Sequence, residues 1–258
     1  MPADRVDPTQ RFSSRVENYV KYRPGYPQGV LGLLEDKCGM TAAAIVADVG
    51  SGTGILTELL LQQGNQVFAV EPNPEMRAAA ELRLSGQLNF ASVAGTSEAT
   101  TLPDQSVEVI TAAQAFHWFD REKARREFLR ILKTDGWVAL IWNDRHTEST
   151  PFLRAYEQLL RTHATDYAEV DHKQMDAKVI GAFLGVGRFG QASFPNRQLF
   201  DFEGLRGRLE SSSYAPEAGH PKHAPMLKDL HTLFDAHQNG GQVAFEYDTV
   251  VYFGQLQP

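Results

Sequence analysis

The sequence predicts an α/β fold, in which an open, mostly parallel β-sheet carries helices on both of its faces. Three observations predict it. Between residues 45 and 144, short runs rich in β-branched residues alternate with stretches of helical periodicity. The first run ends in a turn of three glycines that opens a helix, and two more strand-like runs lie near the end of the chain. Strands that alternate with helices are joined by right-handed crossovers, which produce a parallel sheet covered on both faces.

Five strands and three helices are expected in the alternating part. Each strand is a short apolar run bounded by turn-forming residues, and we place them at 45–49, 66–70, 88–94, 107–113 and 136–142. The helices follow the first, second and fourth strands, at 54–63, 74–84 and 120–132. Pro74 fits the first turn of its helix, and Asp120 is a candidate N-cap for the third.

The alternation stops after residue 144. We expect a helix, an irregular stretch, a strand, a short helix, a loop, a longer helix and a final strand, at 152–162, 164–190, 198–202, 205–210, 211–225, 225–239 and 242–253. These two further strands raise the expected number to seven. A chain of 258 residues fits one decorated α/β domain.

Composition disfavours several classes of function. The net charge of −7 disfavours a domain that binds nucleic acid mainly by charge. The single cysteine, Cys38, allows no intramolecular disulfide framework and has acidic neighbours, so we expect an inert thiol and a cytoplasmic setting. No run approaches the roughly 20 apolar residues that span a membrane. The histidines show no compact metal-ligand spacing, and no metal is expected.

A glycine-rich turn, Asp48-Val49-Gly50-Ser51-Gly52-Thr53-Gly54, joins the first strand to the first helix. Its glycines let the backbone turn tightly and let a ligand approach where a Cβ would otherwise stand. The amide groups at the start of the helix can then hold a polar or anionic group. Alone, the pattern also fits a tight strand-to-helix turn that binds nothing.

The glycine spacing and one acid narrow the choice of ligand. A dinucleotide fingerprint would have glycine at position 55, which is Ile55, and no Lys-Ser or Lys-Thr pair follows as in a phosphate-binding loop. Glu71 ends the next strand, about twenty residues on, where a carboxylate can accept both hydroxyls of a ribose. Because Glu71 precedes Pro72, an acid at a helix N-terminus is the alternative interpretation.

In its motifs and their order, the stretch from about 45 to 145 resembles the class I S-adenosylmethionine-dependent methyltransferases. The glycine turn resembles the first motif of that family, Glu71 its second-strand acid, and Glu98 the acid that reads the adenine amino group. Residues 105–110 and 129–137 resemble two later motifs. One departure is Thr134-Asp135-Gly136, where the family usually carries Pro-Gly, but Asp-Gly forms an equally good turn.

The resemblance implies a Rossmann-like, seven-stranded, mostly parallel sheet with a helical cover, and S-adenosyl-L-methionine as the cofactor. It also implies one methyltransferase domain over 1–258. We divide that domain into an N-terminal helical cap, a cofactor-binding core, an inserted cover and a C-terminal part of the sheet with helices, at 1–40, 41–145, 146–190 and 191–258.

The same resemblance implies which residues hold the cofactor. The glycine turn would hold the methionine end, the second-strand acid would hold the ribose, and the later loops would line the adenine and the methionine portion. In chain order these residues are Asp48, Gly50, Ser51, Gly52, Gly54, Glu71, Asn73, Met76, Thr96, Ser97, Glu98, Gln114 and Ala115. A solvated loop acid is the alternative for Glu98.

A narrower branch, which contains trans-aconitate methyltransferase-like small-molecule enzymes, is resembled by Arg11-Phe12 and by two aromatic segments, 19–27 and 116–119. We place Tyr19 and Arg23 of the first segment at the cofactor site. Arg23 precedes proline, so its backbone is expected to be extended, and its guanidinium could bind a carboxylate of the cofactor or of the substrate. An aromatic arm packed on the sheet edge is the alternative.

His117 follows the fourth strand, at the carboxyl end where ligands bind in such sheets. It is a candidate general base, or it packs beside the cofactor. A carboxylate acceptor would need no base. Trp118, Phe119 and residues 142–145 are further candidates for the pocket wall.

The leading hypothesis is an enzyme, an S-adenosylmethionine-dependent methyltransferase that acts on a small-molecule acceptor, with a carboxylic acid as one candidate. We expect residues 1–30 and 146–190 to cover its pocket. Two alternatives remain open. One is a nucleotide-binding oxidoreductase on a related sheet, and the other is a cofactor-binding scaffold without catalysis. No nucleic-acid partner and no membrane span are expected.

Overall fold

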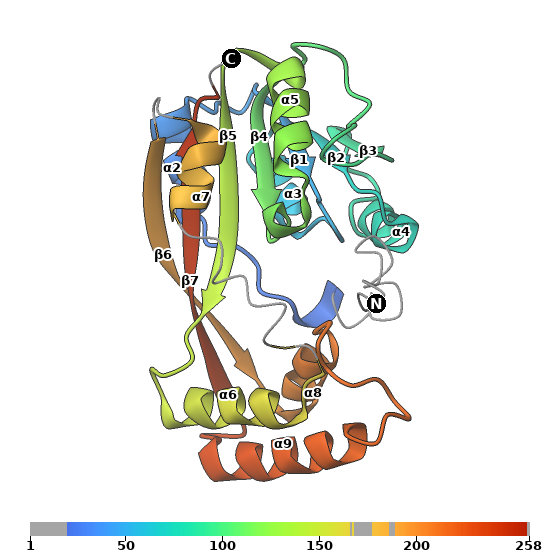
Figure 1. Ribbon diagram of the computed structural model, residues 1–258, viewed down its shortest axis with the longest axis vertical. Coiled ribbons are helices and arrows are strands. Elements are labelled where there is room, and N and C mark those ends of the chain that lie inside the picture. The colour runs from blue at the N-terminus through green and yellow to red at the C-terminus, as the bar shows by residue number, and fades with distance from the viewer. Residues whose placement is uncertain (1–19, 166, 168–176, 186–188, 257–258) are drawn as a thin grey trace.

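The computed structural model describes residues 20–165, 167, 177–185 and 189–256 (Figure 1). Its sheet has seven strands in the order β3-β2-β1-β4-β5-β7-β6. The strands are β1 (Ile45–Val49), β2 (Gln66–Val70), β3 (Phe90–Val93), β4 (Val107–Ala113), β5 (Leu132–Arg145), β6 (Phe189–Phe200) and β7 (Val243–Gly254). β1 to β5 run parallel, and β7 is antiparallel to both of its neighbours. The predicted seven-stranded, mostly parallel sheet is confirmed.

Helices cover this sheet and extend it. They are α2 (Gly29–Cys38), α3 (Ile55–Gln62), α4 (Pro74–Arg83), α5 (Arg121–Ile131), α6 (Pro151–His163), α7 (Ala177–Leu184), α8 (Phe202–Glu210) and α9 (His223–His237), with a short 3-10 helix η2 (Phe116–Trp118). Capping side chains explain two of the starts. Asn73 Oδ1 accepts from the amide of Met76 at 2.8 Å in α4, and Asp120 Oδ1 accepts from the amide of Lys123 at 3.2 Å in α5.

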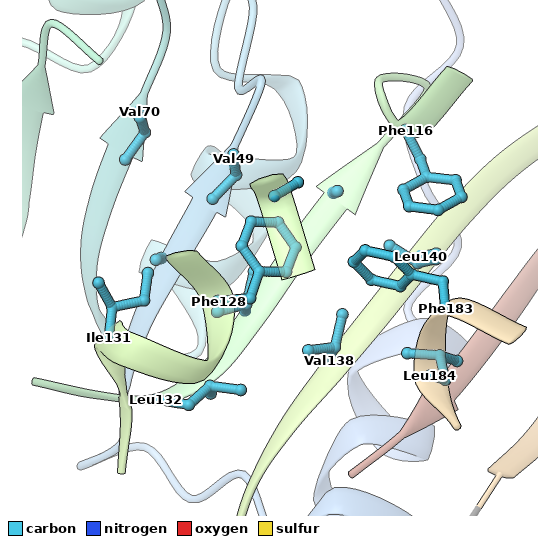
Figure 2. Close-up of a cluster of buried hydrophobic side chains, with 14 of the residues drawn as sticks. Val49, Val70, Phe116, Phe128, Ile131, Leu132, Val138, Leu140, Phe183 and Leu184 are labelled. Carbon is cyan, nitrogen blue, oxygen red and sulfur yellow. The ribbon is translucent and has the colours of Figure 1, made fainter. Parts of the chain in front are cut away.

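Alternate residues of the central strands face two separate apolar layers. Val138 and Leu140 of β5 belong to one layer, with Phe128 of α5 and Phe183 of α7. Figure 2 shows these four side chains converging from the two helices and the strand. Ile141 of β5 belongs to the other layer, with residues of α2 and α3. Burial on both faces is typical of the parallel sheets in α/β proteins.

A third apolar cluster lies where α6, α8 and α9 pack around the far ends of β6 and β7, at the bottom of Figure 1. It buries Tyr156 of α6, Leu205 of α8, Leu230 of α9 and Phe245 of β7. The long strands β5, β6 and β7 therefore join a second helical layer to the parallel part of the sheet. None of the helices in the described ranges is long and apolar enough to cross a membrane.

The chain changes side at β1. It first adds β2 and β3 on one side of β1 and then returns to add β4 on the other side. At such a switch point the carboxyl ends of the two central strands leave a crevice in which ligands bind. This crevice lies at the carboxyl ends of β1 and β4, next to the glycine turn that follows β1.

Two predictions about the second half of the chain were wrong. The pattern predicts an irregular stretch at 164–190, but that stretch contains α7, whose Phe183 ring lies 4.6 Å from the ring of Phe116. The strand predicted at 198–202 begins at Phe189. β6 is an edge strand whose residues alternate between exposed and half-buried, so no apolar run marks it. Pro195 is tolerated there because an edge strand leaves one row of amides unpaired.

Candidate functional site

The turn between β1 and α3 contains glycines with left-handed backbone geometry. The angle φ is 71° at Gly50 and 56° at Gly52, a region that favours glycine. A Cβ on Gly50 would lie 2.6 Å from the Cβ of Ala115, so the turn packs directly against the loop after β4. A Cβ on Gly52 would meet nothing within 4 Å. The backbone at Gly52 therefore faces open space at the switch point.

Glu71 directly follows β2 and holds this turn through its carboxylate. Its Oε2 accepts from the amide of Gly52 at 2.9 Å, and its Oε1 accepts from the amide of Asn73 at 2.9 Å. Burial raises the pKa of Glu71, although the two amides and Arg77 favour its charged form. Each oxygen keeps a lone pair for one more donor, so this carboxylate can accept the two hydroxyls of a ribose.

Asp48 lies beneath the turn, where it is 1% exposed. The hydroxyl of Thr57 donates to its Oδ2 at 2.7 Å, and the hydroxyl of Thr111 donates to its Oδ1 at 2.9 Å. Burial raises the pKa of Asp48 to about 6. Its carboxylate thus ties α3 and β4 to β1. The structure places it behind the turn and not on the cavity wall that the motif predicts for it.

The loop after β3 brings Thr96, Ser97 and Glu98 to the same side of the sheet. Glu98 Oε1 accepts from Ser97 Oγ at 2.7 Å and from the amide of Asp120 at 2.9 Å. Burial alone would raise the pKa of Glu98, but these hydrogen bonds outweigh burial and hold the pKa below its usual value. Glu98 is therefore ionised at neutral pH and fixed to the start of α5.

One cavity of about 410 Å³ gathers most of the residues that the sequence singles out. They are Arg23, Gly50, Gly52, Glu71, Asn73, Met76, Thr96, Ser97, Glu98, Gln114, Ala115 and His117. Ser51 and Gly54 shape the turn without lining the cavity, as Asp48 does. Tyr19 lies outside the described residues. The volume is typical of pockets for small molecules and cofactors.

A sequence model of the methyltransferase domain family matches residues 47–140. That range begins inside β1 and ends inside β5, so it holds the glycine turn, Glu71, Glu98 and the loop after β4 in one match. The protein is an S-adenosylmethionine-dependent methyltransferase. The methyltransferase therefore uses S-adenosyl-L-methionine as its cofactor.

Relatives of the methyltransferase extend over its whole length. A methyltransferase-like protein and a methyltransferase of Schizosaccharomyces pombe, both uncharacterised, are 26% and 29% identical to it. The first match covers 99% of both chains, and the second covers 96% of this chain and 97% of the relative. An uncharacterised methyltransferase of Mycobacterium tuberculosis is 37% identical over 56% of this chain and 57% of its own length.

Solved structures show the same fold. A proposed type II methyltransferase from Anaeromyxobacter dehalogenans matches with a TM-score of 0.66 at 18% identity, over 92% of this chain and 99% of that chain. At this level of identity the match bears on the fold alone. The narrower resemblance to trans-aconitate methyltransferase-like enzymes stays a prediction.

The loop after β4 also lines the cavity of the methyltransferase. Gln114 has a φ of 54°, which is strained for a residue other than glycine. Its amide donates to the carbonyl of Ile141 at 2.8 Å, and its side chain donates to the carbonyl of Asn143 at 3.3 Å. His117 follows in η2, where its ring lies 4.8 Å from the ring of Trp118. The structure thus places Gln114 and His117 on the cavity wall.

The segment before α2 forms another wall of the cavity. Arg23 Nη2 donates to the carbonyl of Ser211 at 2.9 Å. The carbonyl of Gly25 accepts from Asn143 Nδ2 at 3.2 Å and from Asn196 Nδ2 at 2.9 Å. Side chains of β5 and β6 and the loop after α8 therefore hold this segment against the body of the enzyme.

The far part of the cavity comes from residues that the family motifs do not mark. In addition to the predicted Asn143, Asp144 and Arg145, it is lined by Thr147, Tyr167, Arg208, Ser213, Tyr214 and Tyr247. One signal for Arg208 was present in the sequence. It lies three residues after Leu205 and four after Gly204, on the buried face of α8. The tyrosines carry no comparable signal, because buried aromatic residues are common in any core.

Proposed function

We propose that this methyltransferase transfers a methyl group to a small carboxylic acid bound in the far part of the cavity. The composition of that part carries the proposal. In a chain with a net charge of −7, the far part of the cavity gathers two arginines and three tyrosines, namely Arg145, Arg208, Tyr167, Tyr214 and Tyr247. Guanidinium and phenol groups are donors that suit a carboxylate.

The residues at the other end of the cavity fit the cofactor. When bound, S-adenosylmethionine supplies a methyl group on a positively charged sulfur. We assign its ribose to Glu71, its adenine to the wall that contains Met76 and Glu98, and its methionine portion to the open backbone at Gly52. Asp48 supports the turn from below, since threonine hydroxyls hold both of its oxygens.

A carboxylate acceptor needs no general base, because it is already deprotonated at neutral pH. One of its oxygens forms the bond to the methyl carbon while the carbon–sulfur bond breaks, and the electron pair stays on the sulfur. The protein's part is to align the acceptor oxygen with the methyl group and the sulfur. Such alignment contributes roughly 7–11 kcal/mol in well-oriented systems. In this scheme His117 contacts the ligands without taking a proton.

Turnover against carboxylic acids, phenols, quinones and amines, measured as release of S-adenosylhomocysteine, tests the proposal. We expect turnover with carboxylic acids and a product that mild alkali hydrolyses, as a methyl ester requires. The His117→Ala variant should keep turnover of the best acid within about tenfold of the wild type, because a general base typically contributes 10²–10⁴-fold. Turnover of amines or phenols alone, lost in the same variant, would contradict the proposal.

A further inference from the structure

The strongest feature outside the assigned cofactor end is a buried arginine on α8. Arg208 is 6% exposed and lines the far part of the cavity. Its Nη1 donates to Ser212 Oγ at 3.0 Å, and its guanidinium carbon lies 6.0 Å from the centre of the Phe245 ring. Its neighbour Gly207 has no room for a side chain, because a Cβ there would lie 2.0 Å from the ring of Tyr22. α8 therefore packs closely against Tyr22, in the segment before α2, and this contact fixes the position of Arg208.

Arg208 has no carboxylate partner among the described residues, and its Nε has no hydrogen-bond partner among them. Arg145, the other arginine of the far part, has such a partner. Arg145 Nη2 lies 2.7 Å from Glu157 Oε2, so the charge of Arg145 is neutralised within the protein. A buried charge is normally paired, because an isolated charge loses its hydration without compensation. Of the two arginines in the far part, Arg208 is therefore the one whose charge has no carboxylate partner among the described residues.

The groups that adjoin this guanidinium are a serine hydroxyl and aromatic side chains. Tyr214 and Tyr247 line the cavity beside Arg208. The hydroxyl of Tyr247 donates to Gln198 Oε1 at 3.1 Å, and the ring of Tyr214 packs against Tyr167 at 4.9 Å. A low-dielectric wall around one guanidinium strengthens its attraction for an anion. A neutral ligand in the same place would leave the charge without a partner.

We propose that Arg208 is a specificity-determining residue that binds an anionic group of the acceptor, and that this group is not the one that receives the methyl. α8 belongs to the lower helical layer of Figure 1, away from the β1–α3 turn at which the methyl donor binds. The acceptor therefore carries a second polar group, and its anion, a carboxylate in the simplest case, is retained in the product. This inference rests on the proposed function for the identity of the reacting group, but the anion site itself does not.

Paired probes test the anion site directly. Succinate, glutarate and adipate, each compared with its monoamide, are titrated into the full-length protein saturated with S-adenosylhomocysteine. For at least one pair, we expect the wild type to bind the diacid about tenfold more tightly than the monoamide, as loss of one charge-assisted hydrogen bond predicts. The Arg208→Gln variant should bind both members of that pair within about twofold. Arg208→Lys should keep part of the preference, because it keeps the charge.

Arg206→Gln is the matched control, since Arg206 lies on the same helix, is 44% exposed and pairs with Glu210. It should behave as the wild type does. The affinity of Arg208→Gln for S-adenosylhomocysteine should stay within about twofold of the wild type, which shows that the variant is folded. A preference that persists in Arg208→Gln, or a wild type without any preference, would overturn the inference. A third outcome separates the two proposals. If binding prefers the diacid in a way that depends on Arg208, but no carboxylic acid is turned over, the proposed function is overturned and the anion site stands.

Discussion

The backbone amide of Gly52 donates to Glu71 Oε2 at 2.9 Å, so the acid at the end of β2 fixes the tip of the turn that follows β1. The same carboxylate accepts from the amide of Asn73, which caps α4. One side chain thus links the first two strand ends to the starts of the helices that follow them. A change at Glu71 acts on the ligand and on the turn together.

Glu71→Ala should weaken the binding of S-adenosylhomocysteine by roughly 1–3 kcal/mol, because a charged acceptor for the ribose is lost. That range corresponds to about 5- to 150-fold in Kd, which titration calorimetry resolves. The control is Glu81→Ala, an exposed acid of α4 whose Oε1 accepts from Ser92 Oγ at 2.6 Å. If the Glu71 variant binds like the control, the ribose does not lie at the end of β2.

Gly52→Ala should lose cofactor affinity by about tenfold or more, because its Cβ enters the open space on the ligand side of the turn. Gly39→Ala is matched to it. Gly39 ends α2 with a φ of 64°, close to the 56° of Gly52, and a Cβ meets nothing within 4 Å at either position. Both variants should lose about 1 kcal/mol of stability from backbone strain. Equal cofactor affinities, measured beside equal Tm values, would rule out close ligand contact at Gly52.

The contribution of Asp48 to the stability of the ligand-free enzyme should fall between about pH 4 and pH 6. Burial raises the pKa of Asp48 from 3.8 to about 6, so the folded state holds a proton that the unfolded chain has already released. The stabilisation is fully present below pH 3.8 and is lost as the pH rises through 6, by roughly 3 kcal/mol.

Urea unfolding of wild type and Asp48→Asn across this window measures the effect. Relative to the wild type, the variant should gain stability as the pH rises through this window, although it is less stable at low pH because an amide can satisfy only one of the two threonine donors. Glu71, whose pKa burial also raises, should account for part of the slope that remains. Parallel profiles for the two proteins would show that Asp48 is ionised at all these pH values.

Gln114→Gly should relieve backbone strain and reduce kcat/KM. Its φ of 54° costs about 1 kcal/mol or more for a side-chain-bearing residue, which offsets the entropy that glycine adds to the unfolded chain. Stability should therefore change by less than about 1 kcal/mol. Gln105→Gly is the matched control, because Gln105 has a φ of 47° and does not line the cavity. Equal activity in the two variants would show that Gln114 contributes nothing beyond its backbone.

The first half of the fold was predictable because its signals are local. Each strand from β1 to β5 contains a short apolar run between turn residues, and Asn73 and Asp120 cap the helices next to them. The site residues on this half follow from the same logic, since Glu71 comes directly after β2 and Glu98 lies in the loop after β3. The side of the turn on which Asp48 lies was not predictable, because it depends on Thr57 and Thr111 from two other elements.

The second half was harder to predict because its elements depend on distant partners. α7 is short and is held by rings of Phe116 and Phe128, which are far away in sequence. β6 pairs only with β7, whose residues come some 50 positions later, and half of its side chains face solvent. Arg208 reaches the cavity only because α8 packs beneath the N-terminal segment. No local pattern reports that arrangement.

The two ends of the cavity come from different stretches of the chain. The end assigned to the cofactor is built mainly from residues 50–119, and the far end is built mainly from residues 143–247. Substitutions in the stretch that binds the acceptor can therefore accumulate without changing the contacts to the cofactor, and the reverse also holds. A hybrid enzyme could join one relative to another between residues 119 and 143. Its cofactor contacts would then come from the first parent, and its choice of acceptor from the second.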